Sequence, residues 1–117
     1  MRKRITIYHN PRCSKSRQTL QLLKDHGVEP EIVEYLTTPP DAEKLNGILR
    51  MLDMEPRELM RKKEAVYADL DLASADVDRD GLIRAMVENP ILIERPIVVT
   101  EKQACLGRPP ENVLELL

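Results

Sequence analysis

Residues 8–19 of the chain read YHNPRCSKSRQT, and this stretch decides how the rest of the fold is interpreted. The β-branched run Ile5-Thr6-Ile7 precedes it and an apolar-periodic segment follows, which predicts a strand, a tight loop and a helix. Cys13 falls where that helix begins, among unpaired backbone N–H groups and at the positive end of the helix dipole. A cysteine at such a position tends to have a lowered pKa and to form the reactive thiolate. The alternative is a buried structural cysteine in a turn.

The segments that follow this stretch predict a parallel βαβ unit. A helix from Ser14 to about His26 has one apolar side, and Gly27 is a natural stop. A strand is expected at residues 32–36, IVEYL. Two strands joined by a helix of this length pair in parallel with a crossover connection.

The rest of the chain predicts a group of helices, then two strands and a last helix. Asp41 is a suitable N-cap, and helices are expected at residues 42–52, 56–60 and 78–88, whereas residues 67–75 are ambiguous. Strands at 96–100 and 104–106 precede a terminal helix that starts at Pro110 or Glu111. This order resembles a thioredoxin-like (glutaredoxin-like) α/β fold, a mixed sheet of about four strands with an inserted helical region at about residues 41–90. We expect a single domain over residues 1–117.

Composition narrows the class of protein. The chain has 117 residues, a net charge of −2 and neither Phe nor Trp, so its core must be aliphatic and nucleic-acid binding has no bulk electrostatic support. No apolar run approaches the roughly 20 residues that span a bilayer. The basic run Met1–Arg4 is followed only by the short segment Ile5-Thr6-Ile7-Tyr8, which is too short for a signal-peptide core. Two cysteines far apart do not form a secreted disulfide scaffold. We expect a cytoplasmic monomer that binds neither membrane nor nucleic acid.

Three arginines are candidates for an oxyanion site. Arg95 and Arg108 each stand before a proline in loops that flank the predicted last strands, and Arg61 stands at a helix end. Arginine binds oxyanions with a fork of N–H donors, so three arginines near a cysteine would place an anion beside a nucleophile. The alternative is solvated surface charge, or a helix cap in the case of Arg61. The Arg95–Pro96 bond is also a candidate for the cis form.

The residues around Cys13 limit its chemistry. Position 16 is serine, so the CxxC redox pair is absent and a site here would use one protein thiol with an outside thiol as reductant. His9 can influence the thiolate or have no role, and Ser16 can cap the helix or donate to a bound anion. The cysteines and histidines lack zinc-ligand spacing, and we expect no metal. Cys105 is expected to be a core thiol.

Four separated motifs together resemble the arsenate reductases of the glutaredoxin-coupled type, which are thioredoxin-like proteins with an inserted helical region. The first is the cysteine loop itself, and the others follow in order along nearly the whole chain. These are Arg61-Lys62 with Glu64 and Tyr67, then Asn89-Pro90-Ile91-Leu92-Ile93-x-Arg95-Pro96-Ile97-Val98-Val99, and Arg108-Pro109. The sequence resembles the chromosomal branch of the family closely.

The resemblance implies a mechanism. Cys13 would attack arsenate to form a covalent cysteine–arsenic adduct, and His9 would help to set its ionisation. The positions that match the family's oxyanion-binding arginines are Arg61, Arg95 and Arg108. Glutathione, as co-substrate, would attack the adduct and glutaredoxin would take up the glutathione, with no bound cofactor.

Two other functions stay open from the sequence. Members of the chromosomal branch can lack a clear physiological substrate, so the chain could be a glutathione-linked thiol oxidoreductase that acts on another substrate. Relatives of the family also act as non-catalytic adaptors that bind RNA polymerase. Those adaptors typically use a CxxC switch, which Ser16 excludes here, although it does not exclude binding.

Overall fold

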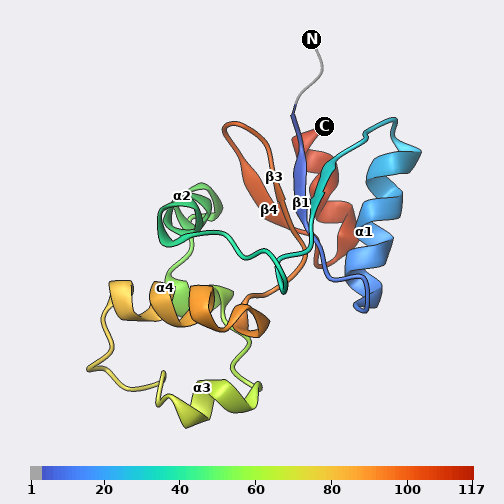
Figure 1. Cartoon of the computed structure of the whole chain (residues 1–117). Helices are drawn as coiled ribbons and strands as arrows, with labels where there is room; N and C mark the ends of the chain where they lie inside the picture. Colours follow the sequence, from blue (N-terminus) through green and yellow to red (C-terminus); the bar gives the residue numbers. More distant parts are fainter. Residues whose placement is uncertain (1–3) are drawn as a thin grey trace. The chain divides into compact units, whose positions relative to one another are not determined.

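Two compact units make up the computed structural model, which describes residues 4–117 (Figure 1). The first unit contains the chain up to Thr38 together with Arg95–Leu117, and the second is Pro39–Glu94. Most of the basic N-terminal run, residues 1–3, lies outside the described residues.

The first unit is built on a mixed four-stranded sheet. Its strands are β1 (Thr6–Tyr8), β2 (Glu31–Val33), β3 (Ile97–Val99) and β4 (Ala104–Leu106), in the order β2-β1-β3-β4. β1 pairs with β2 in parallel, whereas β1–β3 and β3–β4 are antiparallel. The predicted mixed sheet and the parallel βαβ pairing are therefore confirmed.

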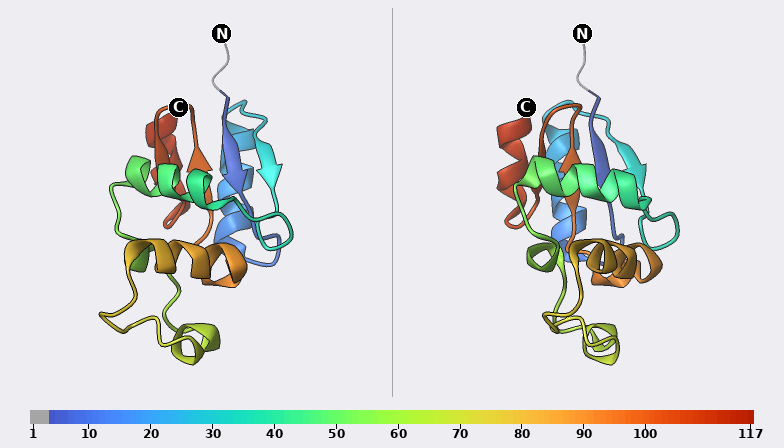
Figure 2. Two further views of the ribbon diagram at one scale, coloured as in Figure 1. Left: turned by 60° about the vertical axis from the view of Figure 1, so that its left-hand side comes forward. Right: turned by 90° about the vertical axis from the view of Figure 1, so that its left-hand side faces the viewer.

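Two helices cover one face of this sheet: α1 (Ser14–Asp25) and the 3-10 helix η3 (Pro110–Leu116), the blue and red helices of Figures 1 and 2. Successive side chains of a strand point to opposite faces of the sheet, and Ile7 and Val98, paired across β1 and β3, belong to the cluster on this face. Ile7 and Val98 from the sheet pack with Leu23 of α1 and with Val113 and Leu116 of η3. The fully buried members of this cluster are aliphatic, as the composition predicted, although Tyr8 and Tyr35 are also buried.

The strand predicted at residues 32–36 is shorter than expected and begins one residue earlier. β2 ends at Val33, and the carbonyl of Glu34 then accepts hydrogen bonds from the N–H groups of Thr37 and Thr38. The apolar side chains of Tyr35 and Leu36 extended the pattern in sequence, but Tyr35 is buried from within a turn. Burial of a turn residue and burial of a strand residue leave the same mark on a sequence.

The second unit is helical. It contains α2 (Ala42–Leu52), η1 (Pro56–Leu59), α3 (Ala65–Asp69), α4 (Arg79–Glu88) and η2 (Pro90–Leu92). The predicted N-cap is confirmed, since the carboxylate of Asp41 accepts a hydrogen bond from the Lys44 N–H at 2.8 Å. Asp78 caps α4 in the same way through Gly81 N–H at 2.8 Å. Within residues 4–117, no helix is both long and apolar enough to cross a bilayer.

Candidate active site

A tight loop delivers Cys13 to the start of α1. The Cys13 N–H donates to the carbonyl of Asn10 at 3.0 Å, and the Arg12 N–H donates to Oδ1 of the Asn10 side chain at 3.0 Å. Arg17, one turn into the helix, donates from Nη1 to the Pro11 carbonyl at 3.0 Å. These bonds hold the loop, and Cys13 takes the extended N-cap position of α1 with φ −93° and ψ 123°.

The surroundings of Cys13 favour its thiolate. Burial raises the pKa of the thiol, but the backbone N–H of Ser16, the charge of Arg95, the N–H of Lys15 and the charge of Arg108 all lower it. The net pKa lies below its ordinary value. The two N–H groups are those of the second and third helical residues, the donors that an N-cap side chain normally satisfies. A half-buried cysteine with a lowered pKa is the combination found in nucleophilic cysteines.

Strand register explains how two distant arginines reach this loop. Tyr8 at the end of β1 lies opposite Ile97 at the start of β3, and Ile97 lies opposite Leu106 at the end of β4. The residues before β3 and after β4 therefore lie at the same end of the strands as the start of the Cys13 loop. Both arginine–proline bonds, Arg95–Pro96 and Arg108–Pro109, are cis.

Arg108 is the arginine in contact with the thiol. Its Nη1 atom lies 4.0 Å from Sγ of Cys13 and 3.4 Å from the carbonyl oxygen of Arg95, to which it donates a hydrogen bond. Arg108 itself is exposed, so its remaining donors can reach solvent or a ligand. The structure thus brings together three of the predicted site residues: the nucleophile Cys13 and the two arginines that flank the β3–β4 hairpin.

His9 and Ser16 form a buried pair behind the loop. The exposed fraction is 6% for His9 and 0% for Ser16. Nδ1 of His9 lies 2.6 Å from Oγ of Ser16, which also accepts the Asn10 N–H at 3.0 Å. Burial is the main cause that lowers the pKa of His9; Glu34 opposes this, and Lys24 and Arg17 add to it. A neutral ring suits the arrangement, because Nδ1 can then accept the Ser16 hydroxyl proton.

Arg61 belongs to the second unit. Its backbone N–H donates to the Leu92 carbonyl at 2.7 Å, which fixes the start of its side chain. The guanidinium pairs with Glu64 at 3.1 Å and more loosely with Glu94 at 3.8 Å. Arg61 is therefore anchored within its own unit, and its charge is partly balanced by two carboxylates.

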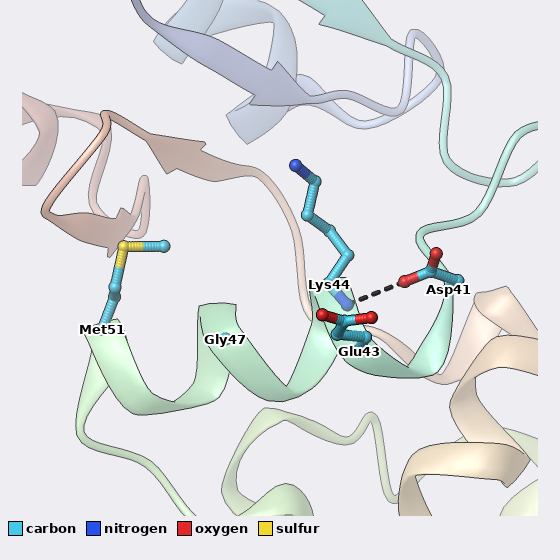
Figure 3. A pocket seen from close by; sticks show the side chains of 5 residues that line it. All are labelled: Asp41, Glu43, Lys44, Gly47 and Met51. Atoms are coloured by element: carbon cyan, nitrogen blue, oxygen red, sulfur yellow. Dashed lines mark hydrogen bonds between the residues drawn. The ribbon is translucent and has the colours of Figure 1, made fainter.

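Other candidate features offer less chemistry. Burial, followed by the charge of Glu115, raises the pKa of Cys105 to about 11, which makes it an unreactive thiol near neutral pH. A hollow of about 370 Å³ lies along α2, and Figure 3 shows Asp41, Glu43, Lys44 and Met51 around it, with no cysteine, serine or histidine in its lining. Residues 4–117 contain no cluster of three or more histidine, cysteine, aspartate or glutamate side chains suited to a metal ion.

One contact near the site was not expected from the sequence. Thr19 of α1 is in contact with Gly107, which directly follows β4. Thr19 is fully buried, and its Oγ1 atom lies 3.3 Å from the Gly107 carbonyl oxygen. The signals were present, since Thr19 ends the cysteine motif and Gly107 directly precedes Arg108. Neither signal shows that residues 88 positions apart are in contact.

Comparison with known proteins agrees with this site. A model described as the ArsC family matches residues 8–116. The chain is 58% identical to the protein YfgD of Escherichia coli (strain K12), with 100% of this chain and 99% of YfgD covered. It is 46% identical to an arsenate reductase of Neisseria meningitidis serogroup A, with 97% of each chain covered.

Solved structures give the same answer. The arsenate reductase from Vibrio cholerae has a TM-score of 0.96 and 48% identity, with 100% of both chains covered. The thioredoxin-like fold expected from the sequence is thereby confirmed, and so is the resemblance of the motifs to the arsenate reductases. With this agreement over nearly its whole length, the chain belongs to the ArsC family.

Proposed function

We propose that this protein reduces arsenate to arsenite, with Cys13 as the nucleophile. The observation that carries the proposal is the half-buried Cys13 at the start of α1, with its lowered pKa and with Arg108 Nη1 4.0 Å from its sulfur. A thiolate attacks more readily than a thiol, and fixed positive charge stabilises an anionic substrate and its transition state. The relatives named arsenate reductase support arsenate as the substrate.

The proposed reaction needs thiols from outside the chain. The Cys13 thiolate attacks arsenic(V) and an oxygen leaves as water, which gives a sulfur–arsenic bond. Glutathione then displaces a second oxygen as water and forms its own sulfur–arsenic bond. The glutaredoxin thiolate attacks the glutathione sulfur, so these two thiols end as one mixed disulfide and their two electrons reduce arsenic(V) to arsenic(III). Water cleaves the remaining Cys13–arsenic(III) bond, which releases arsenite and restores the Cys13 thiol. Ser16 stands where a resolving cysteine would, and Cys105 stays protonated near neutral pH, so neither supplies the second thiol.

We assign the oxyanion to the three arginines. Arg95 and Arg108 act from loops at the end of the strands next to Cys13. Arg61 is included because its position matches the family motif. Ser16 contributes to substrate binding through its backbone N–H, because its hydroxyl is buried against His9. His9 acts through Ser16 on the shape of the loop. We further propose that the protein is cytoplasmic, since a glutathione-rich compartment keeps such thiols reduced. We also propose that it is a monomer.

A coupled assay tests this function. Arsenate-dependent NADPH oxidation is measured with glutathione, glutathione reductase and glutaredoxin, and the proposal predicts turnover that Cys13→Ser abolishes. Cys105→Ser is the matched control and should keep its activity, because it removes the unreactive thiol. If arsenate turnover never exceeds that of Cys13→Ser while Cys13 still reacts with glutathione disulfide, the protein acts on another substrate.

A further inference from the structure

We propose that the close contact between Thr19 and Gly107 positions Arg108 against the Cys13 thiol. Both residues lie outside the set assigned to substrate or nucleophile. The kinetic part of this inference rests on the proposed arsenate reduction, whereas the part that concerns the thiol does not.

The contact leaves no room for a side chain at position 107. A Cβ atom built on Gly107 would lie 2.5 Å from Oγ1 and 2.8 Å from Cγ2 of Thr19, and 2.9 Å from Cγ of Pro96. These separations are shorter than real Cβ contacts. The φ angle of Gly107 is not positive, so its backbone does not itself require glycine. What requires glycine here is the approach of the chain to α1.

Thr19 is well suited to receive this approach because its own side chain is fixed. It is fully buried, and its hydroxyl lies 2.8 Å from the Lys15 carbonyl oxygen and 3.3 Å from that of Gly107. A hydroxyl has one proton, so Thr19 donates mainly to the closer acceptor, the Lys15 carbonyl oxygen. The contact with Gly107 is then mainly one of packing. Packing at this density transmits small displacements, because there is no free volume to absorb them.

The two sides of the contact lead along the chain to Cys13 and to Arg108. Thr19 lies on α1, whose N-cap is Cys13, and Gly107 directly precedes Arg108. The Gly107 N–H also donates to the Pro96 carbonyl at 3.0 Å, which ties the segment to the start of β3 beside Arg95. The separation of 4.0 Å between Arg108 and the Cys13 sulfur is therefore set by a short rigid path through Thr19 and Gly107. Thr19 and Gly107 are positioning residues.

The test is the pKa of Cys13, obtained from the rate of iodoacetamide alkylation against pH and read on the Cys13 peptide by mass spectrometry. Gly107→Ala should raise this pKa, because the added methyl group moves Arg108 away from the thiol and so weakens the charge that favours the thiolate. Its kcat/KM for arsenate should fall about two- to tenfold, the range of one weakened polar contact. Gly47→Ala is the matched control, since a Cβ atom there meets nothing within 4 Å, and should change neither quantity.

Two further comparisons separate positioning from a purely structural role. Thr19→Ala makes room for the new methyl group, so Thr19→Ala/Gly107→Ala should recover part of the wild-type pKa. In an Arg108→Ala background, Gly107→Ala should shift the pKa of Cys13 less than in the wild type, because only its effect through Pro96 on Arg95 remains. A shift of undiminished size without Arg108 would overturn the inference, as would a folded Gly107→Ala protein with the wild-type pKa.

If Gly107→Ala does not fold, the pair Thr19→Ala and Thr19→Ser decides. The first should raise the pKa of Cys13, and the second, which keeps the hydroxyl contact, should hold it near the wild-type value. Equal pKa values for both variants and the wild type would overturn the inference. A protein without arsenate turnover, but with these pKa changes, would contradict the proposed function and leave the positioning role standing.

Discussion

Nη1 of Arg108 lies 4.0 Å from Sγ of Cys13, although the two residues are 95 positions apart in the chain. The antiparallel β3–β4 hairpin creates this proximity, because it returns the chain to the end of the strands where the Cys13 loop begins. A positive charge at that distance favours the thiolate and can also bind an anion that the thiolate attacks. The account of this protein depends on that double role.

Arg108→Ala should weaken both effects. Loss of a charge-assisted bond costs about 1.5–3 kcal/mol, which corresponds to a fall of roughly 13- to 160-fold in kcat/KM for arsenate. The pKa of Cys13 should also rise, and Arg95→Ala should act in the same direction. Steady-state kinetics and alkylation against pH measure the two effects. Arg12→Ala is the control, an exposed arginine next to the cysteine; a loss of equal size in that variant would mean that general charge near the loop, and not Arg108, matters.

The two thiols should differ in reactivity. The pKa of Cys13 lies below its ordinary value, whereas that of Cys105 is raised to about 11, so near neutral pH the thiolate fraction of Cys13 exceeds that of Cys105 by a large factor. Brief treatment with iodoacetamide at pH 7 should therefore modify Cys13 and spare Cys105, as peptide mass spectrometry would show. Comparable labelling of both cysteines in the folded protein would refute the proposed activation of Cys13.

Ser16→Ala should destabilise the loop. The hydroxyl is fully buried, and its loss removes the partner of His9 Nδ1 and of the Asn10 N–H. Unsatisfied groups of this kind cost about 1–3 kcal/mol, so the free energy of unfolding in urea should fall by that amount. Ser14→Ala, at an exposed position in the same helical turn, should cost much less. Equal losses for the two variants would count against the buried pair.

Stability should depend on His9 under acid conditions. The pKa of His9 is lowered from 6.5 in the folded protein, mainly by burial, so below pH 6.5 the unfolded chain takes up a proton that the folded chain does not. The free energy of unfolding should therefore fall as the pH drops from 6.5 toward the folded-state pKa. His9→Asn should flatten this part of the profile. A profile that keeps its slope in His9→Asn would show that other groups cause it.

Local signals in the sequence predicted most of the fold. Asp41 marked the start of α2 correctly, because capping depends on residues within one turn. Three short segments, beginning at Pro56, Pro90 and Pro110, are 3-10 helices, a distinction that apolar spacing does not make. The region left ambiguous at residues 67–75 includes the end of a single short helix, α3, which is too brief to show a period.

The site divides in the same way. The position of Cys13 at a helix start was readable from the sequence, because a β-branched run, a turn and an apolar-periodic segment follow one another there. The approach of Gly107 to Thr19 was not readable, since it depends on the register of β3 and β4 and on the packing of α1. The direction of the Ser16 side chain was likewise hidden, because spacing alone does not tell a hydroxyl that faces a ligand from one that faces His9.

The most direct measurement is the arsenic product itself. Arsenate is incubated with the protein, glutathione and glutaredoxin, and arsenite is quantified by chromatography with arsenic detection. The account predicts that arsenite accumulates with the wild type and with Cys105→Ser, and that Cys13→Ser yields no more than the protein-free control. Arsenite formation by Cys13→Ser at the wild-type rate, or none by the wild type, would contradict the claim that Cys13 is the nucleophile of an arsenate reductase.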